Sequence, residues 1–156
     1  MHTRHVICSF LPFAALFGSA YSQISGPITC SQGAKNNIVT ADIANLAAAF
    51  QAGNVGSLSD PIDMLALSKG GGAQVQASLG SVQVLLDNNF IFESTHVSFA
   101  TVAQALLDLK GQCCGDFDTC IPGSGVVKGD TGLQVDFSIA PFPFSAVRKR
   151  YERASA

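Results

Sequence analysis

Two segments of the chain repeat apolar residues at the three- and four-residue spacing of an α-helix. The first follows Thr40, a residue type that caps helix N-termini, and ends at Gly53. The second follows Ser98 and ends at Gly111. The apolar positions are Ile43, Leu46, Ala47 and Phe50 in the first segment and Phe99, Val102, Ala103, Leu106 and Leu109 in the second. The pattern predicts two short amphipathic helices, each with one face to bury.

Other segments alternate apolar and polar residues, which is typical of strands with one buried face. Residues 73–79 and 82–86 alternate on both sides of Gly80-Ser81, which predicts a hairpin with a two-residue turn. The expected cross-strand partners are Leu79 with Val82, Ala77 with Val84 and Val75 with Leu86. Residues 133–139 form a further strand, and residues 24–30 a weaker one.

The order of these elements is strand, helix, hairpin, helix, strand. This order predicts an α+β fold of the ferredoxin-like βαββαβ type, a two-layer sandwich whose four-stranded antiparallel sheet carries two helices on one face. Two connections are long. One contains Met64, Leu65 and Leu67, which could add a helical turn, and Phe90 to Phe92 could extend the sheet beyond the hairpin.

The first residues have the composition of a secretory signal peptide. Arg4 and His5 precede the apolar run 6–17, and Ala20-Tyr21-Ser22 fits a small-x-small cleavage site. The run is too short to span a membrane, which takes about 20 residues. We therefore expect cleavage after Ser22, a secreted, extracellular protein with no membrane span, one domain over residues 23–147 and a basic tail over 148–156.

The charge of the chain excludes one class of partner. Removal of Arg4 with the signal peptide leaves eight basic and eleven acidic residues, a net charge of −3. A nucleic-acid-binding domain carries a basic surface instead, so we expect no nucleic-acid partner. We expect a monomer without cofactor or metal.

The stretch "KGQCCGDFDTC" holds three of the four cysteines that remain after the signal peptide. An even number in a small secreted chain indicates disulfides, and neighbouring cysteines rarely bridge each other. We expect Cys30 to pair with Cys113 or Cys114, and Cys120 to close a short loop onto the other. Zinc binding would need paired cysteines or nearby histidines, and a thioredoxin-like centre would need Cys-x-x-Cys.

Several segments together resemble a known family, the killer toxins of smut fungi and the small fungal effectors that share their α/β sandwich. The resemblance covers roughly residues 26–140. It lies in the leader, the "PITC" opening, the element order, the helix running into "CCGDFDTC" and the closing strand "GLQVDFSI". It implies a secreted, disulfide-bonded and generally non-enzymatic protein that acts on a plant host, as a virulence factor, or on competing fungi.

The resemblance also bears on the C-terminus, because some members are cut by a dibasic protease during secretion. Arg148, Lys149 and Arg150 offer such a processing site, which would release "YERASA". The alternative is a solvated basic tail.

Few residues suggest catalysis. His96 lies near Ser94 and Ser98, but a catalytic triad depends on spatial geometry that sequence spacing does not supply. Asp116 and Asp118 could form an acidic pair or, alternatively, an exposed turn. The glycine-rich stretches 70–72 and 123–125 are expected to be loops that lead into no helix, so neither predicts a phosphate site.

Residues 23–150 contain neither Trp nor Tyr, which disfavours a sugar-binding site. An apolar contact patch would therefore use phenylalanines, namely Phe90, Phe92, Phe117, Phe142 and Phe144. We name Phe117, Phe142 and Phe144 as candidate binding residues, with core packing as the alternative for the last two. The expected function is binding of a host or competitor protein. The alternatives are a small secreted hydrolase that uses Asp116, Asp118 and His96, or a structural cell-wall surface protein.

Overall fold

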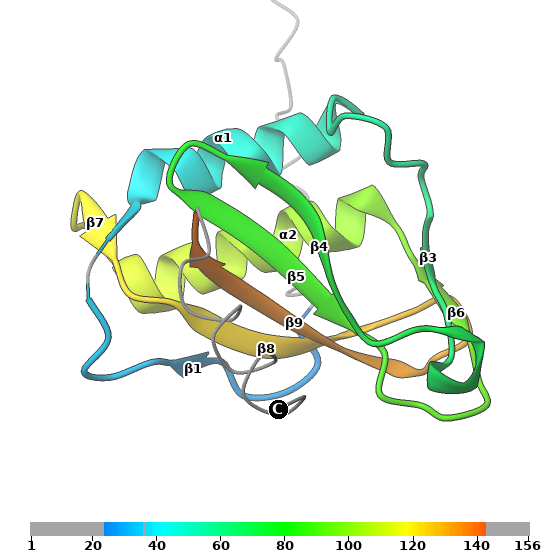
Figure 1. Ribbon diagram of the computed structural model, residues 1–156. Coiled ribbons are helices and arrows are strands. Elements are labelled where there is room, and N and C mark those ends of the chain that lie inside the picture. The colour runs from blue at the N-terminus through cyan, green and yellow to red at the C-terminus, as the bar shows by residue number, and fades with distance from the viewer. Residues whose placement is uncertain (1–23, 36, 143–156) are drawn as a thin grey trace, which may run out of the picture.

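Two helices lie side by side against one face of a twisted antiparallel sheet (Figure 1). The structure is a computed structural model that describes residues 24–35 and 37–142. The helices are α1 (Thr40–Gln51) and α2 (Phe99–Leu109), close to the two predicted ranges. The expectation of an α+β fold with two helices and antiparallel strands is confirmed.

The main sheet has five strands in the order β1-β8-β9-β5-β4, and every neighbouring pair is antiparallel. Its strands are β1 (Thr29–Cys30), β4 (Ala73–Leu79), β5 (Val82–Asp87), β8 (Gly123–Lys128) and β9 (Gln134–Pro141). Ile24 adds an isolated bridge to Val127 at the edge next to β1. The predicted hairpin and the predicted final strand therefore form the centre and one side of the sheet.

Two small ladders and two short turns complete the described residues. The ladders pair β2 (Ile38–Val39) with β7 (Thr119–Cys120), and β3 (Ile62–Met64) with β6 (Thr95–Val97). The turns are the 3₁₀ turn η1 (Leu67–Lys69) and the π-helical turn η2 (Lys110–Cys114), which continues α2. These parts tie the long connections to the helix ends.

The predicted ferredoxin-like arrangement of four strands is wrong. Residues 123–125, expected to be a loop, form the first half of β8, which lies between β1 and β9. A Cβ at Gly123 would lie 2.8 Å from the Cys113 sulfur, and one at Gly125 would lie 2.9 Å from the Ile24 side chain. Because neighbouring chain segments occupy that space, the strand carries glycines where an alternating pattern would have shown apolar side chains.

The register of the hairpin is partly as predicted. Leu79 pairs with Val82 and Ala77 with Val84, across the Gly80-Ser81 turn. Val75 pairs with Leu85 instead of Leu86, because the register shifts between Val75 and Ala77. Because such a bulge adds one residue to β4, the side chains on its two sides no longer follow a single alternation between the faces of the sheet. The start of β4 therefore pairs Ala73 with Asp87.

The helix ends differ from the predictions at two of four positions. Ser98 caps α2 by accepting a hydrogen bond from the Thr101 N–H, and Gly53 ends α1 with a φ of 71°. Thr40 lies inside α1, and its hydroxyl donates to the Phe117 carbonyl at 2.6 Å. Gly111 does not end α2, since η2 continues to Gly115, whose φ is 55°.

The core lies between the helices and the sheet. Phe50 of α1 and Phe99 of α2 meet edge to face, with ring centroids 5.3 Å apart. The sheet contributes the fully buried side chains Val82, Val84, Leu86, Val127, Val135, Phe137 and Ile139. The apolar face of each layer is thus covered by the other, which leaves the outer sheet face and the loops for contact with other molecules.

Candidate interaction surface

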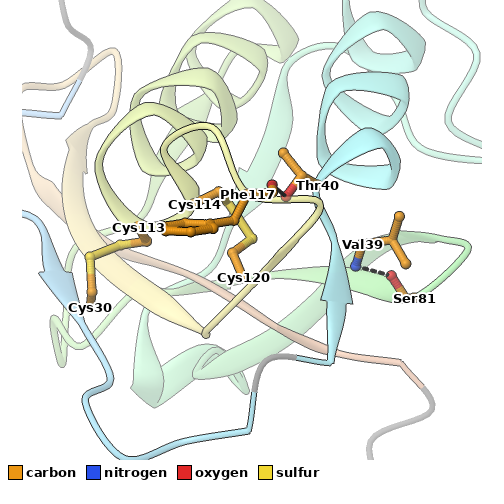
Figure 2. Close-up of a disulfide and its surroundings, with 8 residues drawn as sticks. All are labelled: Cys30, Val39, Thr40, Ser81, Cys113, Cys114, Phe117 and Cys120. Carbon is orange, nitrogen blue, oxygen red and sulfur yellow. Dashed lines mark hydrogen bonds between the residues drawn. A yellow bond between two sulfur atoms is a disulfide. The ribbon is translucent and has the colours of Figure 1, made fainter.

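The cysteines form the two disulfides Cys30–Cys113 and Cys114–Cys120 (Figure 2). The expectation that Cys30 pairs with one of the adjacent cysteines and Cys120 with the other is confirmed, and the structure selects Cys113 for Cys30. The turn η2 sends the two neighbouring side chains to different strands, β1 and β7. The C-terminal end of α2 is thereby fixed to both.

Phe117 lies in the loop that the short disulfide closes, and its side chain is 77% exposed. The loop is attached to the start of α1, since the Thr40 hydroxyl donates to the Phe117 carbonyl (Figure 2) and the Thr40 N–H to the Asp118 carbonyl. Asp116 and Asp118 are both exposed, as expected of an acidic turn. Phe117 is a single exposed ring on a well-held loop.

Phe142 follows β9 and is 48% exposed, while Phe144 lies outside the described residues. The Phe142 N–H donates to the Ser81 carbonyl, and the Ser81 hydroxyl accepts from the Val39 N–H (Figure 2). Val39 in turn pairs with Thr119 of the cysteine loop. Strand β2, with the exposed side chain of Val39, therefore lies between the places of Phe142 and Phe117.

A larger set of exposed apolar side chains lies on two adjoining loops. Its members are Leu65, Leu67, Phe90, Ile91 and Phe92, with exposed fractions between 38% and 79%. The loops lie next to each other, because the Leu67 N–H donates to the Phe90 carbonyl at 2.9 Å and the Ser68 N–H to the Ile91 carbonyl at 3.0 Å. We call these five residues the Phe90–Phe92 surface.

The buried side chain of Asn88 joins these two loops by hydrogen bonds to the backbone of both. Asn88 is fully buried, and its amide donates to the carbonyls of Met64 and Glu93, each at 3.0 Å. Its side-chain oxygen accepts from the Phe90 N–H at 3.1 Å. The Ser94 hydroxyl adds a bond from the Ala66 N–H. The exposed side chains are thus carried by backbone that is already ordered, which reduces the entropy lost on binding.

His96 lies between two carboxylates on a separate part of the surface. Its Nδ1 is 2.9 Å from Asp130 and its Nε2 is 3.3 Å from Asp63. The backbone N–H of His96, followed by its ring, lowers the pKa of Asp130 to about 2. Both ring nitrogens have carboxylate partners, so neither is left to activate a serine. Ser94 and Ser98 bond to backbone N–H groups instead.

The three residues of the predicted hydrolase site are not brought together. His96 precedes α2, whereas Asp116 and Asp118 follow it, and a helix of 11 residues is about 16 Å long. The structure therefore keeps the acidic turn and the histidine at opposite ends of α2.

The described residues hold neither a candidate metal site nor a helix that could span a membrane. Residues 24–35 and 37–142 contain no group of three or more His, Cys, Asp or Glu side chains placed to hold a metal ion. No helix in the same ranges is long and apolar enough to cross a membrane. The predicted processing residues, Ser22 and the triplet 148–150, lie outside these ranges.

Sequence reasoning missed three members of the Phe90–Phe92 surface, namely Leu65, Leu67 and Ile91. The expectation that Phe90 to Phe92 extend the sheet is wrong, since they form a loop. The available signal was "FIF" itself, because three consecutive apolar residues do not fit a strand with one wet face.

The chain matches no family model and no curated protein.

Proposed function

We propose that this protein is a secreted, non-enzymatic effector, similar to the killer toxins of smut fungi, that binds a host or competitor protein through the Phe90–Phe92 surface. One observation carries the proposal. The exposed apolar side chains of this surface stand on loops whose backbone is fixed by the buried Asn88 amide. The signal peptide and the family resemblance support export, and the two disulfides are typical of small exported proteins.

The energetic argument rests on the five exposed apolar side chains. Full burial of one such side chain contributes roughly 1.5–3 kcal/mol. Because Phe90 is 38% exposed and Phe92 is 79% exposed, a partner that covers both rings would gain about 2–3 kcal/mol. Binding energy usually concentrates in a few such central residues. Glu93 and Lys69, both exposed, flank the two loops and provide a polar rim.

The position of His96 favours binding over hydrolysis. A general base needs a free ring nitrogen within reach of the proton it accepts, and here Asp63 and Asp130 occupy both nitrogens. The contacts between His96 and Asp130 instead join β6 to the turn that follows β8.

Saturable attachment to intact cells tests the proposal. The fluorescently labelled protein is added to competing fungal cells and to plant cells, and unlabelled protein is used to displace it. We expect the Phe90→Ser/Phe92→Ser variant to lose at least tenfold in apparent affinity, since two buried rings would be missing. Phe117→Ser is the matched control, because its ring is as exposed as that of Phe92 but lies on the cysteine loop.

Three results would contradict the proposal. An equal loss of apparent affinity in the Phe117→Ser control would mean that attachment does not depend specifically on the Phe90–Phe92 surface. Turnover of a polysaccharide, peptide or nucleic-acid substrate that disappears in Asp118→Ala would favour the hydrolase. Retention of the protein in the cell-wall fraction, instead of the medium, would favour a structural wall protein.

A further inference from the structure

Strand β4 forms one edge of the main sheet (Figure 1). It pairs with β5 on one side, and within residues 24–35 and 37–142 no strand pairs with its other side. An edge strand presents backbone N–H and C=O groups that another extended chain can pair with. The sequence of β4, AQVQASL, holds no charged residue and no proline, which are residue types that protect edge strands from such pairing.

The backbone of Ser78 faces this open edge. Leu79 and Val82 flank the two-residue turn Gly80-Ser81, so they form the hydrogen-bonded pair that closes the hairpin. Hydrogen-bonded and non-hydrogen-bonded pairs alternate along an antiparallel ladder. The next pair, Ser78 with Gln83, is therefore non-hydrogen-bonded, and the N–H and C=O of Ser78 point away from β5. Because Ser78 is exposed, a partner can reach both groups.

A largely apolar pocket of about 220 Å³ lies beside the same part of the strand. The consecutive residues Ala77 to Leu79 line it together, although successive side chains of a strand point to opposite faces, so the pocket reaches the edge of β4. Other lining residues are Leu46 and Ala49 of α1 and Val55, which follows α1, and no described residue that lines the pocket is charged. A cavity of about 150 Å³ is known to hold a benzene ring, so this pocket has room for one branched apolar side chain.

The bulge in β4 favours a short peptide over a second copy of the chain as the occupant of this edge. The register shifts between Val75 and Ala77, and a bulge disrupts regular pairing along a strand. Two copies joined through the full length of β4 would have to continue their ladder across this irregularity. A short peptide needs only the part from Ala77 to Leu79, which is the part beside the pocket.

We propose that the edge of β4 at residues 77–79 binds an extended, uncharged peptide segment of a partner protein as an added strand, with one branched apolar side chain in the pocket beside α1. The backbone of Ser78 supplies main-chain hydrogen bonds, and the pocket selects the side chain, as in other cases of strand addition. This inference goes beyond the proposed function and does not depend on it. The Phe90–Phe92 surface includes Leu67 of η1, which precedes β4, whereas residues 77–79 are the end of β4.

Titration with synthetic peptides gives the first test. The unaltered protein with both disulfides formed is isotope-labelled for NMR and mixed with capped peptides of serine and threonine that carry alanine, valine or leucine at the centre. We expect the valine or leucine peptide to slow hydrogen exchange of the Ser78 N–H about tenfold or more, because the added strand covers it. We also expect this peptide to bind about tenfold more tightly than the alanine peptide, since the larger side chain buries more apolar surface in the pocket.

A peptide of the same sequence with methylated backbone nitrogens is the control probe, because it cannot donate main-chain hydrogen bonds to β4. Equal binding of the methylated peptide, or no protection of the Ser78 N–H by any of the peptides, would overturn the proposal. Protection that rises with protein concentration in the absence of peptide would identify a second copy of the chain as the occupant, and this result would also overturn it.

Two variants test the edge and the pocket separately, and the Tm of each reports whether it remains folded. Ser78→Pro removes the outward N–H, and edge strands tolerate proline where the N–H faces away from the ladder. Ala49→Leu fills the pocket from α1 and leaves the backbone of β4 unchanged. We expect each variant to bind the leucine peptide about tenfold more weakly. Ala48→Leu is the matched control, because Ala48 is exposed on α1 and does not line the pocket.

The Phe90→Ser/Phe92→Ser variant separates this inference from the proposed function. We expect it to bind the leucine peptide as the unaltered protein does, since its changes lie outside the pocket. Loss of peptide binding in this variant would place the peptide on the Phe90–Phe92 surface and contradict the inference. Unchanged binding in folded Ser78→Pro or Ala49→Leu, or an equal loss in Ala48→Leu, would contradict it as well.

Discussion

Asn88 is fully buried and bonds to both loops that carry the Phe90–Phe92 surface. Asn88→Ala leaves the Met64 and Glu93 carbonyls and the Phe90 N–H without their partner. We expect a loss of about 2–4 kcal/mol in the free energy of unfolding, measured by urea denaturation, since several buried polar groups lose their hydrogen bonds.

Asn89→Ala is the control for this substitution. Asn89 is exposed and makes one side-chain bond, to Asp136, so its loss should cost less than about 1 kcal/mol. Equal destabilisation by the two variants would show that Asn88 has no special role in holding the loops.

Asp130 gives a residue-scale prediction about pH. Its folded pKa of about 2 lies below the ordinary value of 3.8, because the backbone and ring of His96 stabilise the carboxylate. A depressed pKa stabilises the fold above about pH 4, and this contribution disappears as the pH falls toward 2. We therefore expect Asp130→Asn to lower the Tm at pH 6, with the difference from the unaltered protein shrinking between pH 4 and 2. Asp116→Asn, in the exposed turn, should show no such convergence.

At the scale of elements, the two disulfides differ in the length of chain that they close. Cys30–Cys113 has a sequence separation of 83 residues and Cys114–Cys120 a separation of 6. In the chain-entropy model these loops correspond to about 4–5 and about 2 kcal/mol. We expect the Cys30→Ala/Cys113→Ala variant to lose about twice as much free energy of unfolding as Cys114→Ala/Cys120→Ala. The reverse order, measured by urea denaturation, would mean that local strain or packing outweighs chain entropy.

The edge of the sheet depends on Gly123 at the start of β8. A Cβ there would lie 2.8 Å from the Cys113 sulfur and 3.1 Å from Leu109, so Gly123→Ala must displace the bridge or the end of α2. We expect a loss of about 1–3 kcal/mol, measured as a fall in the Tm or in the free energy of unfolding. Gly26→Ala is the matched control, because no atom lies within 4 Å of its added Cβ. A neutral Gly123→Ala would show that β8 can shift freely.

At the scale of the whole molecule, one mass measurement tests signal cleavage, tail processing and oxidation together. We expect the exported protein to begin at Gln23. Without reduction it should be lighter by four hydrogens than the reduced form, since each of the two bridges replaces two S–H groups. Free thiols in the exported protein, found by alkylation before reduction, would contradict the bridged fold.

Local patterns determined both helices, the hairpin turn and the last strand, because apolar spacing, the Ser98 cap and Gly53 act within a few residues of one another. Cysteine spacing also limited the bridges to two pairings. The choice of Cys113 for Cys30 depended on η2, a helical continuation that Gly111 did not stop.

Tertiary contacts alone decided the rest. Strand β8 forms by pairing with β1 and β9, and its glycines leave room for Leu109 of α2, the Cys30–Cys113 bridge and Ile24, which no local pattern records. The bulge before Ala77 depends on pairing with β5. The Phe90–Phe92 surface forms because Asn88 joins loops more than twenty residues apart, and exposure of a side chain depends on which distant segment covers it.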